Sequence, residues 1–401
     1  MRLAVDALPL ARRTGGSLRA YIVNLAAATA RMAGDSVDGA LFYAPRGVEA
    51  FPAAPMTRTP TGFLGGSPRL WERFKLADAV FEDKADMLFC PGGVVPPWSL
   101  TPVATLVHDA SALSPPADSP AWRRALAKRL PFAIARSGAI VTATEEIGQS
   151  ILAWNAGLPA PMRKGLFRRA LDRLKPPLDG TARIDGLENR ITVIPWAAED
   201  EFSRPLSSDA LEAFRQSMVG GSFMLAPAMD GCEASLEVAL SAWFATAARL
   251  RRDDALIVLA GCRDRRFGRF ADSARKLGVA GRVRIAVTES TEAAAGFFRA
   301  ASVILVPENR DTGGLSLLRA IASGTPTVAG GFPQPKWLPN GAAVHWISDL
   351  SVKSWHEASV AALAAGGRSG RYKPETTPSW DRHVKTLFAV LAESLRQNAD
   401  A

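Results

Sequence analysis

The stretch ASVILVPENRDTGGLSLLRAIASGTPTVAGG, from Ala301 to Gly331, decides the fold. Its apolar, β-branched run Val303–Val306 predicts a strand that is buried on both faces. After a polar turn, Gly313 and Gly314 lead into apolar residues at helical spacing, and a second short strand follows at Thr327–Ala329. This order of strand, glycine turn, helix and strand predicts a parallel sheet with the turn at its carboxyl edge.

The glycine turn is suited to binding an anion. Glycine lets a ligand approach the backbone, and a helix start offers free N–H groups that carry roughly half a positive charge. Such an end can bind phosphate. On these residues alone, the alternative is an ordinary helix of an α/β fold, with glycine required only for the turn.

Length and composition indicate a soluble, globular protein of two or three domains. The chain has 401 residues, 48% of them hydrophobic, and a mean hydropathy of +0.04. No apolar run approaches the roughly 18 to 20 residues that span a bilayer. The amino-terminal apolar run is broken by Asp6, which favours a first strand over a signal peptide. Cys90, Cys232 and Cys262 are far apart and lack metal spacing, which indicates buried thiols in a reducing compartment.

The positive charge is concentrated in one segment. Net charge is +9, and the segment Ala121–Lys175 holds eleven basic residues against three acidic ones. Such a local field attracts lipid head groups, nucleic acid or a phosphorylated substrate within about a Debye length. Nucleic acid is disfavoured, because the segment lacks interleaved aromatic residues and any known binding module.

A basic amphipathic helix is expected at Met162–Lys175, within this segment. Helices of this kind can lie on anionic membranes or bind an anionic acceptor. The alternative is a helix whose apolar stripe covers the sheet and whose cations are solvated. The cations of its polar face are Arg163, Lys164, Arg168, Arg169 and Arg173.

The rest of the chain alternates strands and helices. Strands are expected at Arg2–Leu8, Ala40–Ala44, Met87–Cys90, Val103–Val107, Val141–Ala143, Ile191–Ile194, Phe223–Ala226, Leu256–Ala260, Val283–Val287, Ser302–Val306 and Thr327–Ala329, and a long loop at Pro45–Pro68. The alternation predicts an α/β protein with two facing, Rossmann-like, doubly wound domains, residues 1–200 and 201–378. A last helix, 379–398, is expected to return to the first domain. Ligands belong in the crevice at the strand carboxyl ends.

The motifs along the chain resemble those of retaining glycosyltransferases of the GT-B fold, and most nearly of glycosyltransferase family 4. Two glycines follow the first strand, an HD pair follows a middle strand, and a strand ending in proline precedes the linker. The carboxyl half carries LIVLAGCRDRRFGRF, KLGVAGRVRIAV, FFRAASVILVPE, GGLSLLRAIASGTPTVAGG and a final SW. The two glycines are Gly15 and Gly16, and the HD pair is His108 and Asp109. The proline is Pro195, and the final SW is Ser379 and Trp380. In this order the motifs extend over nearly the whole chain, which resembles a divergent member of the family.

The resemblance implies a donor site and catalytic residues. His108 would lie close to the donor sugar and stabilise charge beside the departing bond, and Asp109 next to it is a further catalytic candidate. Asp311 stands where the first of two family glutamates contacts the donor sugar. Gly15, Gly16, Gly313, Gly314 and Leu315 would belong to the donor site, with the leaving diphosphate on the helix start. A core histidine is the alternative for His108.

Two positions depart from the family pattern, one at the ribose contact and one at the diphosphate contact. The second family glutamate, which accepts hydrogen bonds from the ribose, is replaced by Arg319, which has donors only. Losing such a bond costs about tenfold to a hundredfold in affinity. Arg319 is then expected to bind a phosphate or to point to solvent. A family basic pair that clamps the diphosphate is replaced by Glu233, Ala234 and Ser235. Replacement cations could come from Arg263, Arg265, Arg266, Arg310 and Arg319, each of which could instead be a solvated surface residue.

The sequence therefore predicts a metal-independent glycosyltransferase of the hexosyltransferase type, without a cofactor. It would move a sugar with retention from a nucleotide-diphosphate sugar to a lipid-linked or polysaccharide acceptor, in envelope or exopolysaccharide biosynthesis. It would be cytoplasmic, with peripheral contact to the anionic inner membrane face. The main alternative is a catalytically degenerate GT-B protein that serves as a binding or scaffold subunit. A sugar-nucleotide isomerase or a phosphorylase on the same fold is a further alternative.

Overall fold

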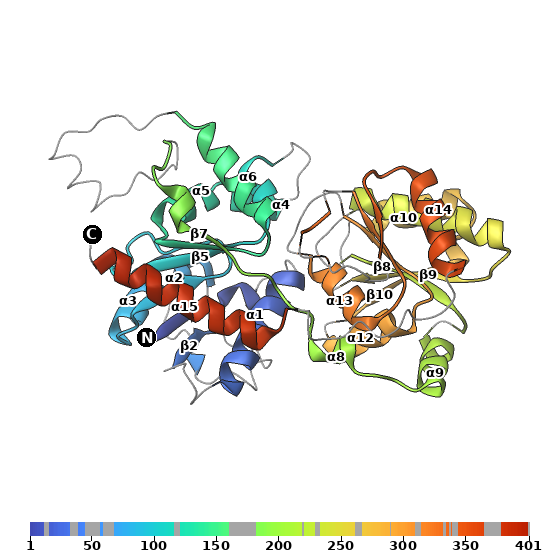
Figure 1. Cartoon of the computed structure of the whole chain (residues 1–401), viewed down its shortest axis with the longest axis horizontal. Coiled ribbons are helices and arrows are strands. Elements are labelled where there is room, and N and C mark those ends of the chain that lie inside the picture. Colours follow the sequence, from blue (N-terminus) through green and yellow to red (C-terminus); the bar gives the residue numbers. More distant parts are fainter. Residues whose placement is uncertain are drawn as a thin grey trace. The chain divides into compact units, whose positions relative to one another are not determined.

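The computed structural model describes residues 1–11, 16–32, 39–44, 57–58, 68–115, 121–159, 182–218, 220–228, 233–260, 267–288, 290–308, 314–331, 334–336, 338, 344–364 and 378–399. The chain divides into two compact units (Figure 1). The first comprises residues 1–14, 18–196 and 380–401, and the second comprises residues 15–17 and 197–379.

The first unit holds a parallel sheet of seven strands in the order β3-β2-β1-β4-β5-β6-β7. Its strands are β1 (Leu3–Asp6), β2 (Ala40–Tyr43), β3 (Thr57–Arg58), β4 (Met87–Cys90), β5 (Val103–Val107), β6 (Ala139–Thr142) and β7 (Ile191–Val193). Its helices are α1 (Gly16–Arg31), α2 (Pro68–Phe74), α3 (Leu76–Glu82), α4 (Ala121–Ala127), α5 (Leu130–Arg136), α6 (Glu145–Ala156) and α15 (Trp380–Ala399).

The second unit holds a parallel sheet of six strands in the order β10-β9-β8-β11-β12-β13. Its strands are β8 (Phe223–Pro227), β9 (Ala255–Ala260), β10 (Val283–Val287), β11 (Ile304–Pro307), β12 (Thr327–Gly330) and β13 (Val344–Ile347). Its helices are α8 (Asp200–Ser203), α9 (Ser208–Met218), α10 (Glu233–Leu250), α11 (Phe267–Lys276), α12 (Thr291–Ala300), α13 (Leu315–Ser323) and α14 (Val352–Ala364).

The sheet of the second unit is buried on both faces, as its apolar strands predict. Along β8, Met224 packs into one core cluster and Leu225 into the other. Residues of α10 and α14 complete the first cluster, and residues of α12 and α13 complete the second, so the two pairs of helices cover opposite faces (Figure 1). Because side chains alternate along a strand, a strand buried on both faces must be apolar throughout. The prediction of a doubly wound α/β fold in both halves is confirmed.

The C-terminal helix α15 belongs to the first unit and contacts β6. Asp381 accepts a hydrogen bond of 2.7 Å from Arg31 of α1. His383 lies in the core of the unit, hydrogen-bonded to Tyr21 of α1 at 3.0 Å. The last helix thus packs against elements more than 200 residues away in the sequence.

Some boundaries differ from the sequence prediction. The first strand ends at Asp6, because Asp6 Oδ1 accepts a hydrogen bond from the Leu8 N–H and turns the chain into a 3-10 helix, Leu8–Ala11. The predicted loop Pro45–Pro68 contains β3, which pairs with β2. The edge strand β13 was not predicted, since its half-buried side chains give no continuous apolar run.

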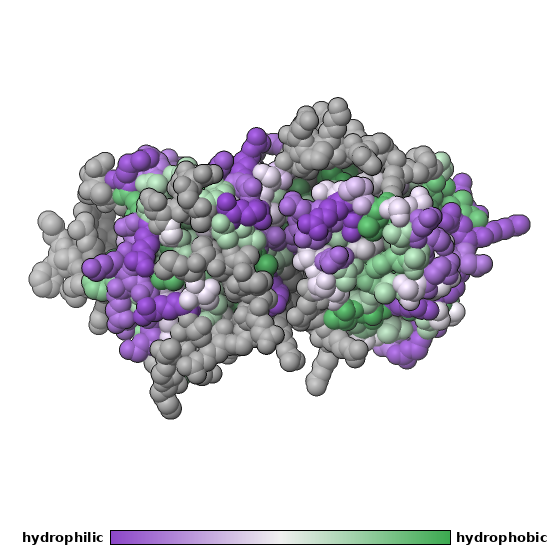
Figure 2. Space-filling view, turned by 90° about the horizontal axis from the view of Figure 1, so that it is seen from below, coloured by the Kyte–Doolittle hydropathy of each residue, from purple (hydrophilic) through white to green (hydrophobic). Residues whose placement is uncertain are grey.

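None of the described helices is both long enough and apolar enough to cross a membrane. On the face drawn in Figure 2, hydrophilic residues cover much of the described surface, and hydrophobic residues form separate patches between them. The apolar residues that dominate the strands lie inside the two units instead.

Candidate functional site

The carboxyl end of β5 carries the predicted His-Asp pair. His108 is half-buried, and its ring stacks on Trp196 with 6.3 Å between centroids and 28° between planes. Trp196 itself is 1% exposed. The chain just after β7 thus fixes one side of the histidine ring, at the edge where parallel sheets bind ligands.

Asp109 has structural partners on both carboxylate oxygens. Oδ1 accepts a hydrogen bond of 2.9 Å from the Ser111 N–H, and so caps the 3-10 helix Ala110–Leu113. Oδ2 lies 3.6 Å from Nη2 of Arg123, and both residues are at most 5% exposed. These contacts orient the loop that follows His108. A catalytic role for Asp109 stays a prediction.

A buried polar pair lies behind the His108–Trp196 stack. His383 Nδ1 is 2.9 Å from the Pro195 carbonyl oxygen, which can only accept, so Nδ1 carries the proton. His383 Nε2 then accepts the hydrogen bond from the Tyr21 hydroxyl. Burial of His383 lowers its pKa to about 4. The histidine is therefore neutral at physiological pH and holds the segment Pro195–Trp196 against α1 and α15.

Buried carboxylates at the same edge were not identified as site residues from the sequence. Asp6 ends β1 and is fully buried, and Glu72 of α2 is 2% exposed. Burial, with the negative charges of Asp6 and Glu72 nearby, raises the pKa of the Cys90 thiol at the end of β4. The only sequence signal was Asp6 itself, which interrupts an apolar strand.

In the second unit, α13 begins directly after the glycine turn. Gly314 has φ 65°, a left-handed conformation that suits glycine, and Leu315 starts the helix with 2% exposure. Gly314 contributes no side-chain cap, and its carbonyl accepts from the Leu318 N–H at 2.8 Å. The first turn of α13 thus presents backbone N–H groups at the carboxyl end of β11.

Glycine is required at the neighbouring strand end. Gly331, after β12, has φ 94°, and a Cβ there would lie 2.3 Å from the carbonyl oxygen of Glu308. Glu308 follows β11 and is 7% exposed. The two chain segments that leave β11 and β12 are therefore in backbone contact, which only glycine permits.

Arg319 forms a bidentate ion pair with Glu199. Arg319 Nε donates to Oε2 at 2.9 Å, and Nη2 donates to Oε1. Both residues are 4% exposed, and the guanidinium lies over the Phe202 ring, 5.1 Å from its centroid. The expectation that Arg319 points to solvent is wrong, because the linker before α8 supplies a carboxylate that the sequence did not place there. Its assignment to the donor site stays a prediction.

The start of α10 is the place where the family that the chain resembles has a basic pair. Ser235 is 1% exposed, and its Oγ has no hydrogen-bond partner in the described part of the chain. Gly16 begins α1 at the corresponding place in the first sheet. Both helix starts follow strands of the parallel sheets, as the sequence predicts.

Most of the other candidate residues lie outside the described residues. These are Gly15, Asp311, Gly313, Arg163, Lys164, Arg168, Arg169, Arg173, Arg263, Arg265, Arg266 and Arg310. Among the residues that the structure does describe, no group of three or more His, Cys, Asp and Glu side chains could hold a metal ion.

Known proteins were compared with this chain in sequence and in structure, and solved structures share its architecture. No family model matches the chain. The crystal structure of WaaG, a glycosyltransferase involved in lipopolysaccharide biosynthesis, superposes with a TM-score of 0.61 at 14% identity, over 100% of this chain and 95% of that one. Anabaena Alr3699/HepE in complex with UDP and glucose gives a TM-score of 0.59 at 11% identity, over 100% and 98%.

The fold is GT-B. Two units, each with a parallel sheet covered by helices, and the end-to-end similarity to glycosyltransferase structures carry this assignment. At these identities the GT-B neighbours establish the fold alone, because one fold hosts many activities.

One curated sequence relative is a D-inositol 3-phosphate glycosyltransferase from Actinosynnema mirum, 33% identical over 167 residues. The match covers 37% of this chain and 40% of the relative, so the chain spans about two fifths of the relative's length.

Proposed function

We propose that this GT-B protein is a glycosyltransferase that uses a nucleotide-diphosphate sugar. The start of α13 carries the proposal: its N-cap is a left-handed glycine that supplies no side-chain cap, at the carboxyl edge of a parallel sheet. The diphosphate would rest on the N–H groups at Gly314 and Leu315, which stabilise negative charge as the bond to the sugar breaks. Two similarities support this chemistry: the fold is similar to that of a UDP-bound protein and of a glycosyltransferase, and part of the sequence is similar to that of a glycosyltransferase.

His108 would lie close to the donor sugar, as in the family that the chain resembles. Its ring is held by Trp196 yet remains half-buried rather than closed off. In this role the imidazole stabilises charge beside the departing bond, and the Asp311 carboxylate accepts a hydrogen bond from a sugar hydroxyl. The transfer proceeds with retention of the anomeric configuration, without a metal ion, as expected for a member of family 4.

The acceptor would be a lipid-linked sugar or a polysaccharide of envelope or exopolysaccharide biosynthesis. The basic segment Ala121–Lys175 supports an anionic or membrane-borne acceptor. In this proposal the protein works in the cytoplasm and binds the inner membrane face peripherally. Arg168→Glu/Arg169→Glu should abolish sedimentation with anionic liposomes, and unchanged sedimentation would exclude a membrane role for these two residues.

The decisive experiment starts with calorimetry against a panel of nucleoside diphosphates, followed by turnover of the matching nucleotide sugars. We expect one nucleotide to bind, and a product whose anomeric configuration, read by NMR, equals that of the donor. Binding without turnover on any acceptor would favour a scaffold protein, the alternative that Arg319 motivates. Absence of binding to every nucleotide would exclude the enzyme proposal.

A further inference from the structure

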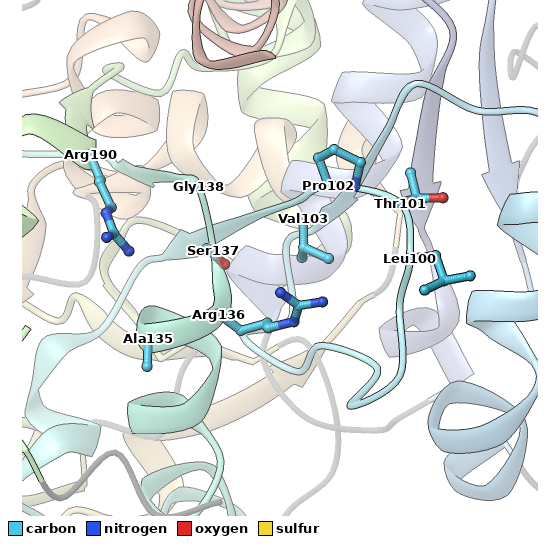
Figure 3. A pocket seen from close by; sticks show the side chains of 9 residues that line it. All are labelled: Leu100, Thr101, Pro102, Val103, Ala135, Arg136, Ser137, Gly138 and Arg190. Carbon is cyan, nitrogen blue, oxygen red and sulfur yellow. The ribbon is translucent and has the colours of Figure 1, made fainter. Parts of the chain in front are cut away.

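A cavity of about 620 Å³ opens at the amino-terminal edge of the first sheet (Figure 3). Loops that lead into β5, β6 and β7 form it. The residues that line it are Leu100, Thr101, Pro102, Val103, Ala135, Arg136, Ser137, Gly138 and Arg190. Since all strands of this sheet are parallel, the cavity lies at the opposite edge from His108 and is a separate place on the unit.

The cavity has a positive lining. Arg136 and Arg190 contribute two guanidinium groups, and none of the lining residues is acidic. In Figure 3 the two side chains lie on either side of Ser137. Both arginines are half-buried, where water screens their charge less than on an open surface. Two cations that face one space favour an anionic occupant.

The guanidinium of Arg136 is held in place by a hydrogen bond, although not all of its N–H groups have an acceptor among the described residues. Its Nη2 donates to the Ser99 carbonyl oxygen at 2.7 Å, and its Nε is buried with no hydrogen-bond partner in the described part of the chain. Neither Arg136 nor Arg190 forms an ion pair with an acidic residue of the described ranges.

A second cavity shows the contrast. In the second unit, about 220 Å³ is lined by residues that include Arg215, Ser302 and Thr325. There Arg215 Nε donates to the Ala300 carbonyl oxygen at 2.8 Å, and Nη1 lies 3.2 Å from Glu212. Its donors are directed to the protein itself. Of these two cavities, the larger is lined by two arginines and the smaller by one.

We infer that the cavity at Arg136 and Arg190 is a binding site for a phosphate monoester, separate from the nucleotide-sugar site. A phosphate monoester carries close to two negative charges at neutral pH, which match the two guanidinium groups. Arginine binds phosphate oxygens through paired N–H groups. The volume leaves room for the organic group that carries the phosphate, and Leu100, 81% exposed, offers it an apolar contact at the mouth.

The test measures binding of inorganic phosphate by calorimetry, with excess UDP present to occupy any nucleotide site. We expect Arg136→Gln and Arg190→Gln each to weaken phosphate binding about tenfold or more, as for the loss of a charge-assisted hydrogen bond. Arg136→Lys, which keeps the charge, should lose less. Arg183→Gln is the matched control: Arg183 is exposed, precedes β7 and does not line the cavity.

Vesicles identify the source of the phosphate. If cosedimentation with vesicles of phosphatidylcholine and phosphatidic acid requires Arg136 and Arg190, the ligand is a lipid head group. Phosphate binding without such cosedimentation assigns a soluble phosphate monoester. The inference is overturned if the parent does not bind phosphate, or if both glutamine variants bind it as the Arg183→Gln control does. Nucleotide binding is scored separately, so either proposal can fail alone.

Discussion

Arg319 of α13 and Glu199 of the linker form an ion pair that is closed off from water, with two hydrogen bonds between the guanidinium and the carboxylate. Removing one partner leaves the other charge buried without compensation, which costs about 3–5 kcal/mol. We therefore expect Arg319→Met to lower the free energy of unfolding by that amount in urea titrations. The double variant Arg319→Met/Glu199→Leu should recover most of the loss. A double variant less stable than either single one would contradict this account.

The buried His383 predicts a stability that falls with acid. Its folded pKa of about 4 lies below the unfolded value of about 6.5, so only the unfolded state takes up a proton between these values. The contribution is complete above about pH 6.5, is lost progressively as the pH falls below that value, and is gone once the pH has fallen through about 4. From pH 7 to pH 5 we expect a loss of about 2 kcal/mol, on the order set by the two pKa values.

The comparison with His383→Gln isolates this effect from other titrating groups. The difference in unfolding free energy between parent and variant should shrink by the same amount at pH 5. A difference that does not change with pH would show that His383 is not protonated selectively in the unfolded chain.

The His108–Trp196 stack predicts graded effects on turnover. If His108 stabilises charge at the departing bond, His108→Ala should lower kcat about a hundredfold or more while nucleotide affinity stays unchanged. Trp196→Phe keeps an aromatic ring in contact and should retain most activity, whereas Trp196→Leu should lower kcat. Initial rates on the identified donor measure this, and an unaltered kcat for His108→Ala would remove the residue from the mechanism.

Gly331 allows a prediction with a matched control in the same unit. Gly331 has φ 94° and its added Cβ would meet the Glu308 carbonyl oxygen, whereas Gly278 has φ 71° and its added Cβ would meet nothing within 4 Å. Alanine at Gly278 should cost about 1–2 kcal/mol for the left-handed conformation alone. Gly331→Ala should cost clearly more, measured by urea unfolding. Equal losses would mean that the segments after β11 and β12 separate easily.

Cys90 is predicted to be unreactive in the folded protein. Burial and the carboxylates Asp6 and Glu72 raise the pKa of its thiol, and only the thiolate reacts with alkylating agents. In a Cys232→Ser/Cys262→Ser background, iodoacetamide at pH 8 should label Cys90 only after unfolding in urea. Labelling of the native protein at the rate of a free thiol would show that this strand end opens to solvent.

The sequence by itself determined the elements and the fold class. The apolar run of β11, the glycine turn and the helical spacing of α13 are local signals, because a strand buried on both faces and a helix each impose their own period on the residues. The same reasoning located β8 and β9. It missed β3 and β13, two short edge strands whose exposed or half-buried residues follow no continuous apolar pattern.

Only the tertiary structure decided what the polar residues of these elements contact. Arg319 and Glu199 are 120 positions apart, and Tyr21 and His383 are 362 apart. Residue type told which hydrogen bonds each side chain could make, but its partner depends on how the chain returns through space. Periodicity reports the burial of a side chain, and it carries no information on which distant charge compensates a buried arginine or which carbonyl fixes a buried histidine.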